Sequence, residues 1–320
     1  MLPRLLQMSG RVLVLGDGDL SFSRALSNVL EPPSHLTATV LEEDQDLLLQ
    51  RYPWTAWENI VQLRERGARI IFGIDATRVH LDNLGLFDKI IFNFPQAPPL
   101  PKKRNQIQRH RALLADTFAS AHRLLSSRWS EILVSLKAGQ GGTALDLHRD
   151  YGNTWQIEEM AAQSGLALVE VFRVEVGLLE SFGYVPGGYR LSSRSFPADR
   201  SLCHVFRLAS EESKVLSPRR FQRDINLTCQ LDCPPQRVLD QVVRLLQASR
   251  VEIDFLQLVD VFHREKDLKS LTYRVELWSE RVPLYRALVS RLVRGIVEPI
   301  YAQDSSGDLE ELKESKRGDI

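Results

Sequence analysis

Apolar residues in the first part of the chain gather in short runs, and stretches with helical spacing separate these runs. The run Val12–Leu15 is continuous and apolar, which is typical of a parallel strand buried on both faces. Strands that alternate with helices pair in parallel through right-handed crossovers, so the pattern predicts an α/β fold. Further strands are predicted at 36–42, 68–75, 87–95, 131–137, 167–175 and 201–209, and helices near 57–66, 105–126 and 155–164.

Beyond residue 218 the pattern changes to a simple alternation. Ile225, Leu227 and Cys229 alternate with polar residues, as in a strand with one buried face. The order of the elements is β-α-β-β-α, which predicts a small ferredoxin-like α+β domain with both helices on one face. The remaining elements are a helix from Pro235, strands at 256–262 and 271–278, and a helix carrying Leu284, Leu288, Leu292 and Ile296.

The polar stretch between these two patterns sets the predicted domain limits. The α/β domain is predicted at 1–210, a linker at 211–218 and the α+β domain at 219–302. The segment 303–320 is acidic and rich in small residues, so it is predicted to be disordered. The length of 320 residues suits two domains.

Composition changes this picture little. The chain is 43% hydrophobic and 26% charged, which is ordinary for a globular protein. It holds 41 Lys and Arg against 41 Asp and Glu, so any contact with nucleic acid has to come from local patches. No apolar run reaches the ~18–20 residues that cross a membrane, and the first residues lack a secretory signal pattern. A soluble intracellular protein without a membrane partner is therefore predicted.

The cysteines and two tryptophans are assigned to packing. The three cysteines have neither metal-ligand spacing nor an even number for disulfides, so no metal is expected. Cys203 and Cys229 are predicted to be small core residues. Trp54 and Trp57 are predicted to be packing residues as well.

Two glycines follow the first strand, in the turn Gly16-Asp-Gly18-Asp that leads into an amphipathic segment. Such a turn lets the backbone approach a nucleotide-like ligand, and dinucleotide oxidoreductases share it with methyltransferases. Asp17 and Asp19 would repel a pyrophosphate at the helix N-terminus but attract an ammonium group. The turn therefore favours S-adenosylmethionine over a dinucleotide, with Gly16, Asp17 and Gly18 as candidate binding residues.

Polar residues also mark the ends of three further predicted strands. Glu42 ends the second strand, where a carboxylate can accept hydrogen bonds from a ribose diol. Asp75 ends the third, where it can accept a hydrogen bond from an adenine amino group. Asn93-Phe94-Pro95 ends the fourth, beside the position expected for a transferable methyl group. Each feature alone is common in solvated loops and turns, but their recurrence at successive strand ends favours a ligand site.

These motifs, in this order, resemble the eukaryotic rRNA uridine-N3 methyltransferase family over about the first 210 residues. The resemblance implies a seven-stranded, Rossmann-like methyltransferase domain with an antiparallel last strand. It also implies an enzyme that methylates N3 of a uridine with S-adenosylmethionine. Ser21 would join the two glycines at the methionine end, and Phe94 would stack on a flipped-out base framed by Asn93 and Pro95. The segments that carry the resemblance are 16–23, 38–39, 73–77, 93–95, 135–137 and 155–157.

One position departs from that family. Its members typically carry a histidine after Asn-Phe-Pro, whereas this chain has Gln96. If such a histidine assists loss of the N3 proton, this chain is slow or inactive. Two interpretations stay open: a uridine-N3 methyltransferase, and a non-catalytic RNA-binding or assembly factor that keeps a relict cofactor pocket.

Basic residues follow the fourth predicted strand, and they are predicted to orient RNA through its phosphates, with a solvated loop as the alternative. The later segment 181–190 mixes aromatic residues and arginine in a manner suited to bases and phosphates, with a hairpin tip as the alternative. The candidate RNA-binding residues of the two segments are Lys102, Lys103, Arg104, Arg109, Arg111, Tyr189 and Arg190.

The α+β domain resembles the ferredoxin-fold anticodon-binding domain of phenylalanyl-tRNA synthetases over 217–302. The resemblance implies contact with a tRNA through the open face of the sheet, and an interaction module without an RNA role is the alternative. That family closes its sheet with a fourth strand, for which 298–301 is too short. The motifs are 223–224, 260–262 and 269–274, and the side chains expected on the open face are Asn226, Thr228, Thr272 and Arg274.

Together, a methyltransferase-like domain and this second domain resemble proteins of the ferredoxin-fold anticodon-binding domain-containing type. The first domain favours rRNA as the partner and the second favours tRNA, so the RNA stays open between them. The cytoplasm and the nucleolus are the compartments consistent with these partners.

Overall fold

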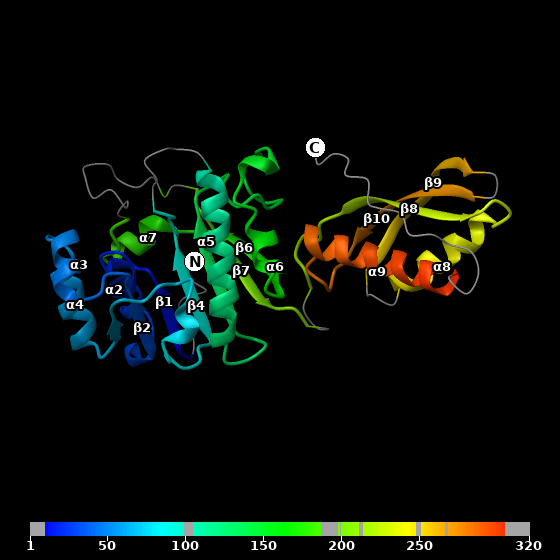
Figure 1. Ribbon diagram of the computed structural model, residues 1–320. Coiled ribbons are helices and arrows are strands. Elements are labelled where there is room, and N and C mark those ends of the chain that lie inside the picture. The colour runs from blue at the N-terminus through cyan, green and yellow to red at the C-terminus, as the bar shows by residue number, and fades with distance from the viewer. Residues whose placement is uncertain are drawn as a thin grey trace. The chain divides into compact units, whose positions relative to one another are not determined.

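The computed structural model describes residues 10–98, 105–186, 198, 200–210, 214–247, 251–265 and 268–304 (Figure 1). The chain divides into two compact units, Met1–Ser217 and Pro218–Ile320. Each unit has its own sheet and its own hydrophobic core.

The first unit is built on a seven-stranded sheet. Its strands are β1 (Val12–Leu15), β2 (Leu36–Thr39), β3 (Arg69–Ile71), β4 (Lys89–Asn93), β5 (Glu131–Leu136), β6 (Leu166–Arg173) and β7 (Leu202–Leu208). Their order across the sheet is β3-β2-β1-β4-β5-β7-β6. Neighbouring strands from β3 to β5 are parallel, whereas β7 runs antiparallel to β5 and β6. The predicted seven-stranded α/β sheet with an antiparallel last strand is confirmed.

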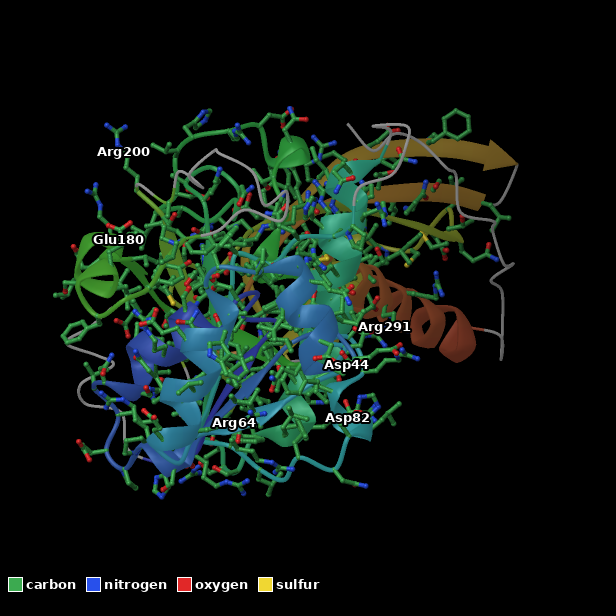
Figure 2. All side chains as sticks on the ribbon, turned by 90° about the vertical axis from the view of Figure 1, so that its left-hand side faces the viewer. Asp44, Arg64, Asp82, Glu180, Arg200 and Arg291 are labelled. Atoms are coloured by element: carbon green, nitrogen blue, oxygen red, sulfur yellow. The ribbon has the colours of Figure 1, made fainter. Side chains whose placement is uncertain are left out.

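The helices of the first unit are α2 (Ser21–Ser27), α3 (Gln45–Arg51), α4 (Ala56–Glu65), α5 (Gln106–Ala121), α6 (Ile157–Ala162) and α7 (Val176–Ser181). The sequence pattern did not predict α3 and α7, because each buries a single residue, Leu48 and Leu179, and so shows no apolar face. At the start of α3, Asp44 accepts a hydrogen bond from the Leu47 amide at 2.8 Å (Figure 2 labels Asp44). A capping side chain therefore defines this helix more clearly than its apolar spacing does.

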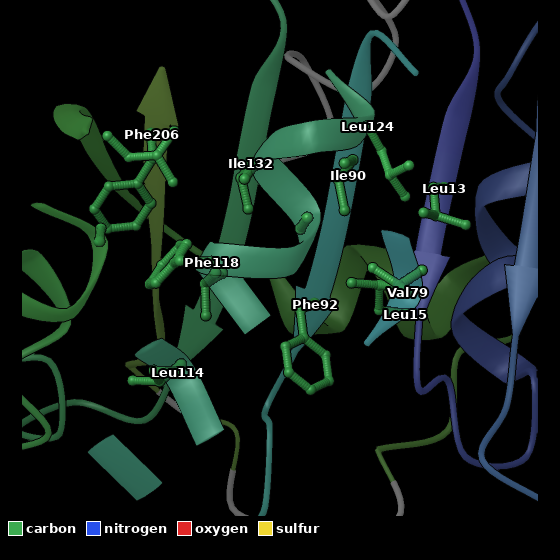
Figure 3. Packing of buried hydrophobic residues seen from close by; sticks show 14 of the residues in the cluster. Leu13, Leu15, Val79, Ile90, Phe92, Leu114, Phe118, Leu124, Ile132 and Phe206 are labelled. Atoms are coloured by element: carbon green, nitrogen blue, oxygen red, sulfur yellow. The ribbon is translucent and has the colours of Figure 1, made fainter. Parts of the chain in front are cut away.

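Two hydrophobic clusters cover the two faces of this sheet. Val12 and Val14 of β1 pack in one cluster, together with residues of α2 and α4. Leu13 and Leu15 pack in the other, which includes Phe118 of α5 (Figure 3). Because both faces are covered, the strand is apolar at every position, as its continuous run predicted.

Trp54 and Trp57 lie outside both cores. They are 91% and 57% exposed, so the prediction that they are packing residues is wrong. The buried face of α4 is formed by Ala56, Ile60 and Leu63, and Trp57 follows Ala56 on a different face of the helix. By contrast, the prediction that Cys203 and Cys229 are buried is confirmed.

The second unit contains a three-stranded antiparallel sheet covered by two helices. Its elements are β8 (Phe221–Gln230), α8 (Pro235–Gln247), β9 (Glu252–Glu265), β10 (Leu268–Trp278) and α9 (Arg286–Asp304). They follow the predicted β-α-β-β-α order, and β10 lies between the other two strands. Alternate residues of β10, among them Tyr273 and Val275, pack in one core with Val242 of α8 and Val289 of α9. The predicted ferredoxin-like unit is confirmed for the part of the chain that the structure describes.

Some details of this unit differ from the prediction. The helix α9 begins after Leu284, which therefore lies outside it, and continues to Asp304, beyond the predicted start of the disordered tail. Thr228 was expected on the open face, but it is only 3% exposed, as is Ser270 opposite it in the register. The remainder of the tail, 305–320, lies outside the described residues.

Candidate functional site

The carboxyl end of β1 continues into the turn that contains Gly16 and Gly18. Both glycines have φ of 56°, a left-handed conformation that favours glycine. A Cβ atom at Gly16 would come within 3.2 Å of the Phe92 ring, so the neighbouring strand also restricts this position. The Asp17 amide donates a hydrogen bond to the Thr39 carbonyl at 3.0 Å, which ties the turn to the end of β2.

Both acidic residues of this turn bind backbone amides at the start of α2. Asp17 Oδ2 accepts a hydrogen bond from the Ser23 amide at 2.7 Å. Asp19 Oδ1 accepts one from the Ser21 amide at 3.1 Å. Amides that would bind a pyrophosphate at this helix therefore already have acceptors, which argues against a dinucleotide.

The carboxylate of Asp17 is held in an unfavourable environment. Burial raises the pKa of Asp17 to about 7, against the hydrogen bond from Ser23, and the charge of Asp19 adds to the increase. Among the described residues, no Lys, Arg or His forms an ion pair with Asp17. A ligand that brings a positive charge to this turn would favour the ionised carboxylate.

Ser21 uses its hydroxyl to hold a distant segment of the chain. The hydroxyl donates a hydrogen bond to the Val185 carbonyl at 3.2 Å and accepts one from the Val185 amide at 3.1 Å. The next residue, Phe22, packs edge-on against Tyr184 with the ring centroids 5.8 Å apart. The hydroxyl that the sequence placed at the methionine end of a cofactor is thus already engaged with the segment after α7.

Glu42 and Asp75 lie after β2 and β3, and both have local partners. Arg51 Nη1 lies 2.6 Å from Glu42 Oε1, which leaves Oε2 as the oxygen for a ligand hydroxyl. Asp75 Oδ1 accepts hydrogen bonds from the Thr77 amide and hydroxyl at 2.9 and 2.7 Å. Although burial acts in the opposite direction, these bonds and the charge of Arg78 lower the pKa of Asp75.

The adjacent ends of β4 and β5 contain unsatisfied polar atoms. Asn93 of β4 lies opposite Ser135 of β5 in the parallel register. Phe94 follows with φ of 49°, which is uncommon for a residue other than glycine, and its amide donates to the Ser135 carbonyl at 2.9 Å. Asn93 Oδ1 and Ser135 Oγ are buried and have no hydrogen-bond partner among the described residues. Orphaned polar atoms at a strained strand end indicate a ligand site.

A histidine reaches position 96 from another element. His110 of α5 places Nε2 3.3 Å from Gln96 Oε1, and its Nδ1 lies 2.8 Å from the Gln106 carbonyl oxygen. The imidazole ring stacks on Trp155, with centroids 4.0 Å apart and an interplanar angle of 13°. Burial lowers the pKa of His110, and the charge of Arg109 acts in the same direction. The ring is therefore neutral at pH 7.

Asp146 holds the loop after β5 in place through hydrogen bonds with backbone amides. Its carboxylate accepts hydrogen bonds from the amides of Gly141 and Gly142 at 2.9 and 3.3 Å, and from the Gly139 amide. His204 of β7 lies against this loop, because a Cβ at Gly141 would come within 2.7 Å of His204 Nε2. That nitrogen is buried without a partner among the described residues, and burial lowers the pKa of His204 to about 4.

Two of the arginines predicted to bind RNA are engaged within the first unit. Arg111 donates hydrogen bonds to the carbonyls of Gly152 and Thr154 at 2.8 and 2.7 Å. Arg109 donates to the Pro98 carbonyl. These contacts connect α5 to neighbouring loops, so the two side chains already have a structural role.

The other predicted RNA-binding residues divide into two groups. Arg274 of β10 forms a bidentate ion pair with Asp224, with N···O distances of 2.8 and 2.9 Å. This partner lowers the pKa of Asp224 and compensates the charge of the arginine locally. Those that lie outside the described residues are Lys102, Lys103, Arg104, Tyr189 and Arg190.

The sequence analysis missed two tyrosines beside the glycine turn. A Cβ at Gly18 would come within 3.3 Å of the Tyr52 hydroxyl, and Tyr184 packs at the start of α2. Burial raises the pKa of both tyrosines, and the charges of Asp17 and Asp19 contribute. Tyr184 lies in a segment that the sequence did single out, but Tyr52 ends the unpredicted helix α3 and gave no signal.

The site fits a cofactor of the predicted kind. A half-buried carboxylate without a cation suits an ammonium group, and the orphaned atoms of Asn93 and Ser135 suit hydrogen-bonding groups of a ligand. Within the described ranges, no cluster of His, Cys, Asp and Glu is arranged to hold a metal ion. No helix in those ranges is long and apolar enough to span a membrane.

Most of the first unit matches a known protein family. Residues 13–182 match the family described as BMT5-like, "rRNA (uridine-N3-)-methyltransferase BTM5-like". The chain is 38% identical over 201 residues to the Homo sapiens "Ferredoxin-fold anticodon-binding domain-containing protein 1", in a match that covers 61% of this chain and 30% of that protein. The Mus musculus homolog is 35% identical over 227 residues, with 69% of this chain and 34% of that protein covered.

The chain thus spans about a third of the length of these two relatives. Among solved structures, it is similar to the 16S rRNA methyltransferase KamB, at 14% identity and a TM-score of 0.40. That match covers 65% of this chain and 93% of the other.

Proposed function

This chain belongs to the BMT5-like family of rRNA (uridine-N3-)-methyltransferases, and from this premise we propose that it methylates N3 of a uridine in RNA, with S-adenosylmethionine as cofactor and rRNA as substrate. The observation that carries the proposal is that the neighbouring strands β1, β4 and β5 end beside one acidic residue without a cation and two polar atoms without hydrogen-bond partners. Asp17 lacks a cation, and Asn93 Oδ1 and Ser135 Oγ lack hydrogen-bond partners among the described residues.

In this proposal the turn after β1 binds the methionine end of the cofactor. The cofactor supplies a methyl group on a positively charged sulfonium. Gly16 and Gly18 allow close approach of the backbone, and Asp17 binds the ammonium group. Glu42 accepts hydrogen bonds from the ribose through Oε2, and Asp75 accepts one from the adenine amino group.

The end of β4 receives the target base. Asn93 binds the polar edge of the uracil, Phe94 stacks on its ring, and Pro95 borders the same site. These residues hold N3 in line with the methyl group, and such alignment is the main requirement of a transfer between two bound reactants. The proton on N3 leaves to water.

Cofactor binding is the first test. Calorimetry with S-adenosylhomocysteine is expected to show micromolar binding to the wild-type protein. Asp17→Asn should weaken this binding, because the variant lacks the charge that faces the ammonium group. Asp82→Asn, at an exposed carboxylate in the loop before β4 (labelled in Figure 2), is the matched control and should bind as the wild type does.

Methyl transfer is the second test. The protein is incubated with RNA and isotopically labelled S-adenosylmethionine, and the digested nucleosides are analysed by mass spectrometry for 3-methyluridine. Labelled 3-methyluridine supports the proposal. Cofactor binding without transfer to any RNA would favour a factor with a relict pocket, and absence of cofactor binding to the folded protein would overturn the cofactor site itself.

A further inference from the structure

We propose that the side chains of Trp54 and Trp57 form a stacking surface for unpaired bases of the RNA substrate. The inference rests on the proposed function and names the structural class of its substrate, a single-stranded or looped segment of RNA instead of a duplex. The two side chains are called the indole pair below.

The indole pair differs from the other three tryptophans of the chain, because each of those rings has a partner. Trp155 stacks on a histidine ring, Trp278 lies under an arginine, and so does Trp129, which is 57% exposed. The side chains of Trp54 and Trp57 form no ring contact, cation–π contact or hydrogen bond within the part of the chain that the structure describes. Aromatic surface that is both exposed and unstacked is available to a ligand.

The segment that carries the indole pair connects α3 to the first turn of α4 (Figure 1), and it is held against the glycine turn at both ends. At one end, the Tyr52 hydroxyl would lie 3.3 Å from a Cβ at Gly18. At the other end, Asn59 Nδ2 donates a hydrogen bond to the Asp19 carbonyl at 2.8 Å. Each tryptophan is two residues from one of these contacts, which is at most about 7 Å of chain.

This location is at the carboxyl edge of the parallel strands. The glycine turn follows β1, and Asn93 ends the neighbouring strand β4 at the same edge. In the proposed function, this edge binds both the cofactor and the target uridine. An RNA strand that enters the site therefore passes along the edge that the indole pair borders.

The charged residues on either side of the indole pair in the chain have partners of opposite sign. Glu58 follows Trp57, and its Oε1 lies 3.3 Å from Arg24 Nη1. Arg51 precedes the segment, and its Nη1 lies 2.6 Å from Glu42 Oε1. Because these charges are compensated, the contribution of the indole pair is contact with base rings and not attraction of phosphates.

Unpaired bases are the partner that such a surface fits. An aromatic side chain stacks on the face of any base, but only where the base has left its own helical stack. The chemistry of the reaction makes the same demand, because N3 of uridine lies on the edge that pairs with adenine in a duplex. A segment of RNA that is already unpaired satisfies both requirements without the energy that base flipping costs.

The inference is tested by RNA affinity of the full chain, without an activity assay. The probes are a single-stranded oligonucleotide that contains uridine and the same oligonucleotide annealed to its complement. The variants are Trp54→Ala combined with Trp57→Ala, and Trp54→Phe, which keeps an aromatic ring. Trp129→Ala is the matched control, because Trp129 has the same exposed fraction as Trp57 but precedes β5, at the opposite edge of the sheet.

The double alanine variant is expected to bind the single strand at least about tenfold more weakly than the wild type does. The dependence of this affinity on salt should be unchanged, because no phosphate contact is removed. Trp54→Phe should retain most of the wild-type affinity, and Trp129→Ala should retain all of it. Affinity for the duplex should be the same in every variant.

Wild-type affinity of the folded double variant for the single strand would overturn the inference and leave the indole pair to a protein partner. An equal loss of affinity for single strand and duplex, or a wild-type protein that binds no single-stranded RNA, would overturn it as well. The proposed function is judged separately, by the formation of 3-methyluridine. A protein that loses RNA affinity as expected but forms no 3-methyluridine would remove the proposed function and leave the stacking surface.

Discussion

The strand ends of the first unit and the open sheet face of the second both collect polar side chains, but on the second the arginines Arg220 and Arg274 are paired with carboxylates. In the first unit, Asp17 has no cation and Asn93 Oδ1 has no hydrogen-bond donor among the described residues. In the second, Arg274 is paired with Asp224, and Arg220 lies 3.0 Å from Glu276. An unsatisfied polar atom gains a hydrogen bond when a ligand binds, whereas a paired charge at the surface already has its partner.

The second unit extends this contrast beyond single ion pairs. Arg220 also forms an ion pair with Asp254, and its guanidinium lies over the ring of Trp278. The indole nitrogen of Trp278 donates to the same Asp254 at 3.0 Å. An arginine with two acidic partners offers little attraction to a phosphate, so this face gives less support for RNA binding than the resemblance to an anticodon-binding domain implies.

The largest expected effect is at Asp17. In Asp17→Asn, affinity for S-adenosylhomocysteine should fall about 100-fold, because a charge-assisted contact is removed. The free energy of unfolding of the ligand-free protein at pH 8 should rise by about 2 kcal/mol. The stability that wild-type Asp17 contributes is present below pH 3.8 and is lost as the pH rises toward 7, since its folded pKa is raised.

Urea unfolding and calorimetry of the same preparations measure both quantities, with Asp82→Asn as the control. A variant that is less stable and binds the cofactor normally would show that Asp17 is a structural cap. Asp17 would then no longer support the contrast between the two units.

An intermediate effect is expected at His204, another residue of the first unit with a buried polar atom that lacks a partner among the described residues. Its folded pKa of about 4 lies below the ordinary value of 6.5. Its contribution to stability is therefore full above pH 6.5 and is lost as the pH falls from 6.5 toward 4, by about 3 kcal/mol in total. Unfolding of the wild type and of His204→Phe, followed at several pH values, isolates this term, because Phe does not titrate. Parallel pH profiles for the two proteins would contradict the expectation.

The smallest effect is expected at Arg274. Because its ion pair with Asp224 is at the surface, Arg274→Ala should leave the free energy of unfolding essentially unchanged. Affinity for a uridine-containing RNA, and the dependence of that affinity on salt, should also be unchanged. A reduction of the salt slope by about one would identify Arg274 as a phosphate contact and would remove the distinction between the two units.

The sequence predicted those parts of the fold that depend on local pattern. The strand β1 is apolar on both faces, so its run is continuous and easily recognised, and the alternation in β10 is equally clear. The helices α3 and α7 were not predicted because each buries one residue only, so neither has an apolar face that a spacing argument can detect. Trp57 was misplaced because hydrophobicity does not state which face of α4 a residue occupies.

The sequence was sufficient to predict which residues form the candidate site, but not which other residues they contact. The strand ends with Asp17 and Asn93 follow from the order of motifs along the chain. The pairing of Arg111 with Thr154, 43 residues away, and the approach of His110 to Gln96 depend on how α5 packs. Side chains that meet only through tertiary packing leave no periodic signal, so reasoning from spacing assigned Arg111 to RNA and overlooked His110.

The reciprocal hydrogen bonds between Ser21 and Val185 bear on when the site is completed during synthesis. They join residues 164 positions apart, so the start of α2 cannot reach its final contacts until most of the first unit has left the ribosome. A nascent chain that ends before Val185 would contain every residue of the glycine turn and still lack the contact that closes it. The glycine turn, which is synthesised early, is therefore among the last parts of the first unit to gain its full set of contacts.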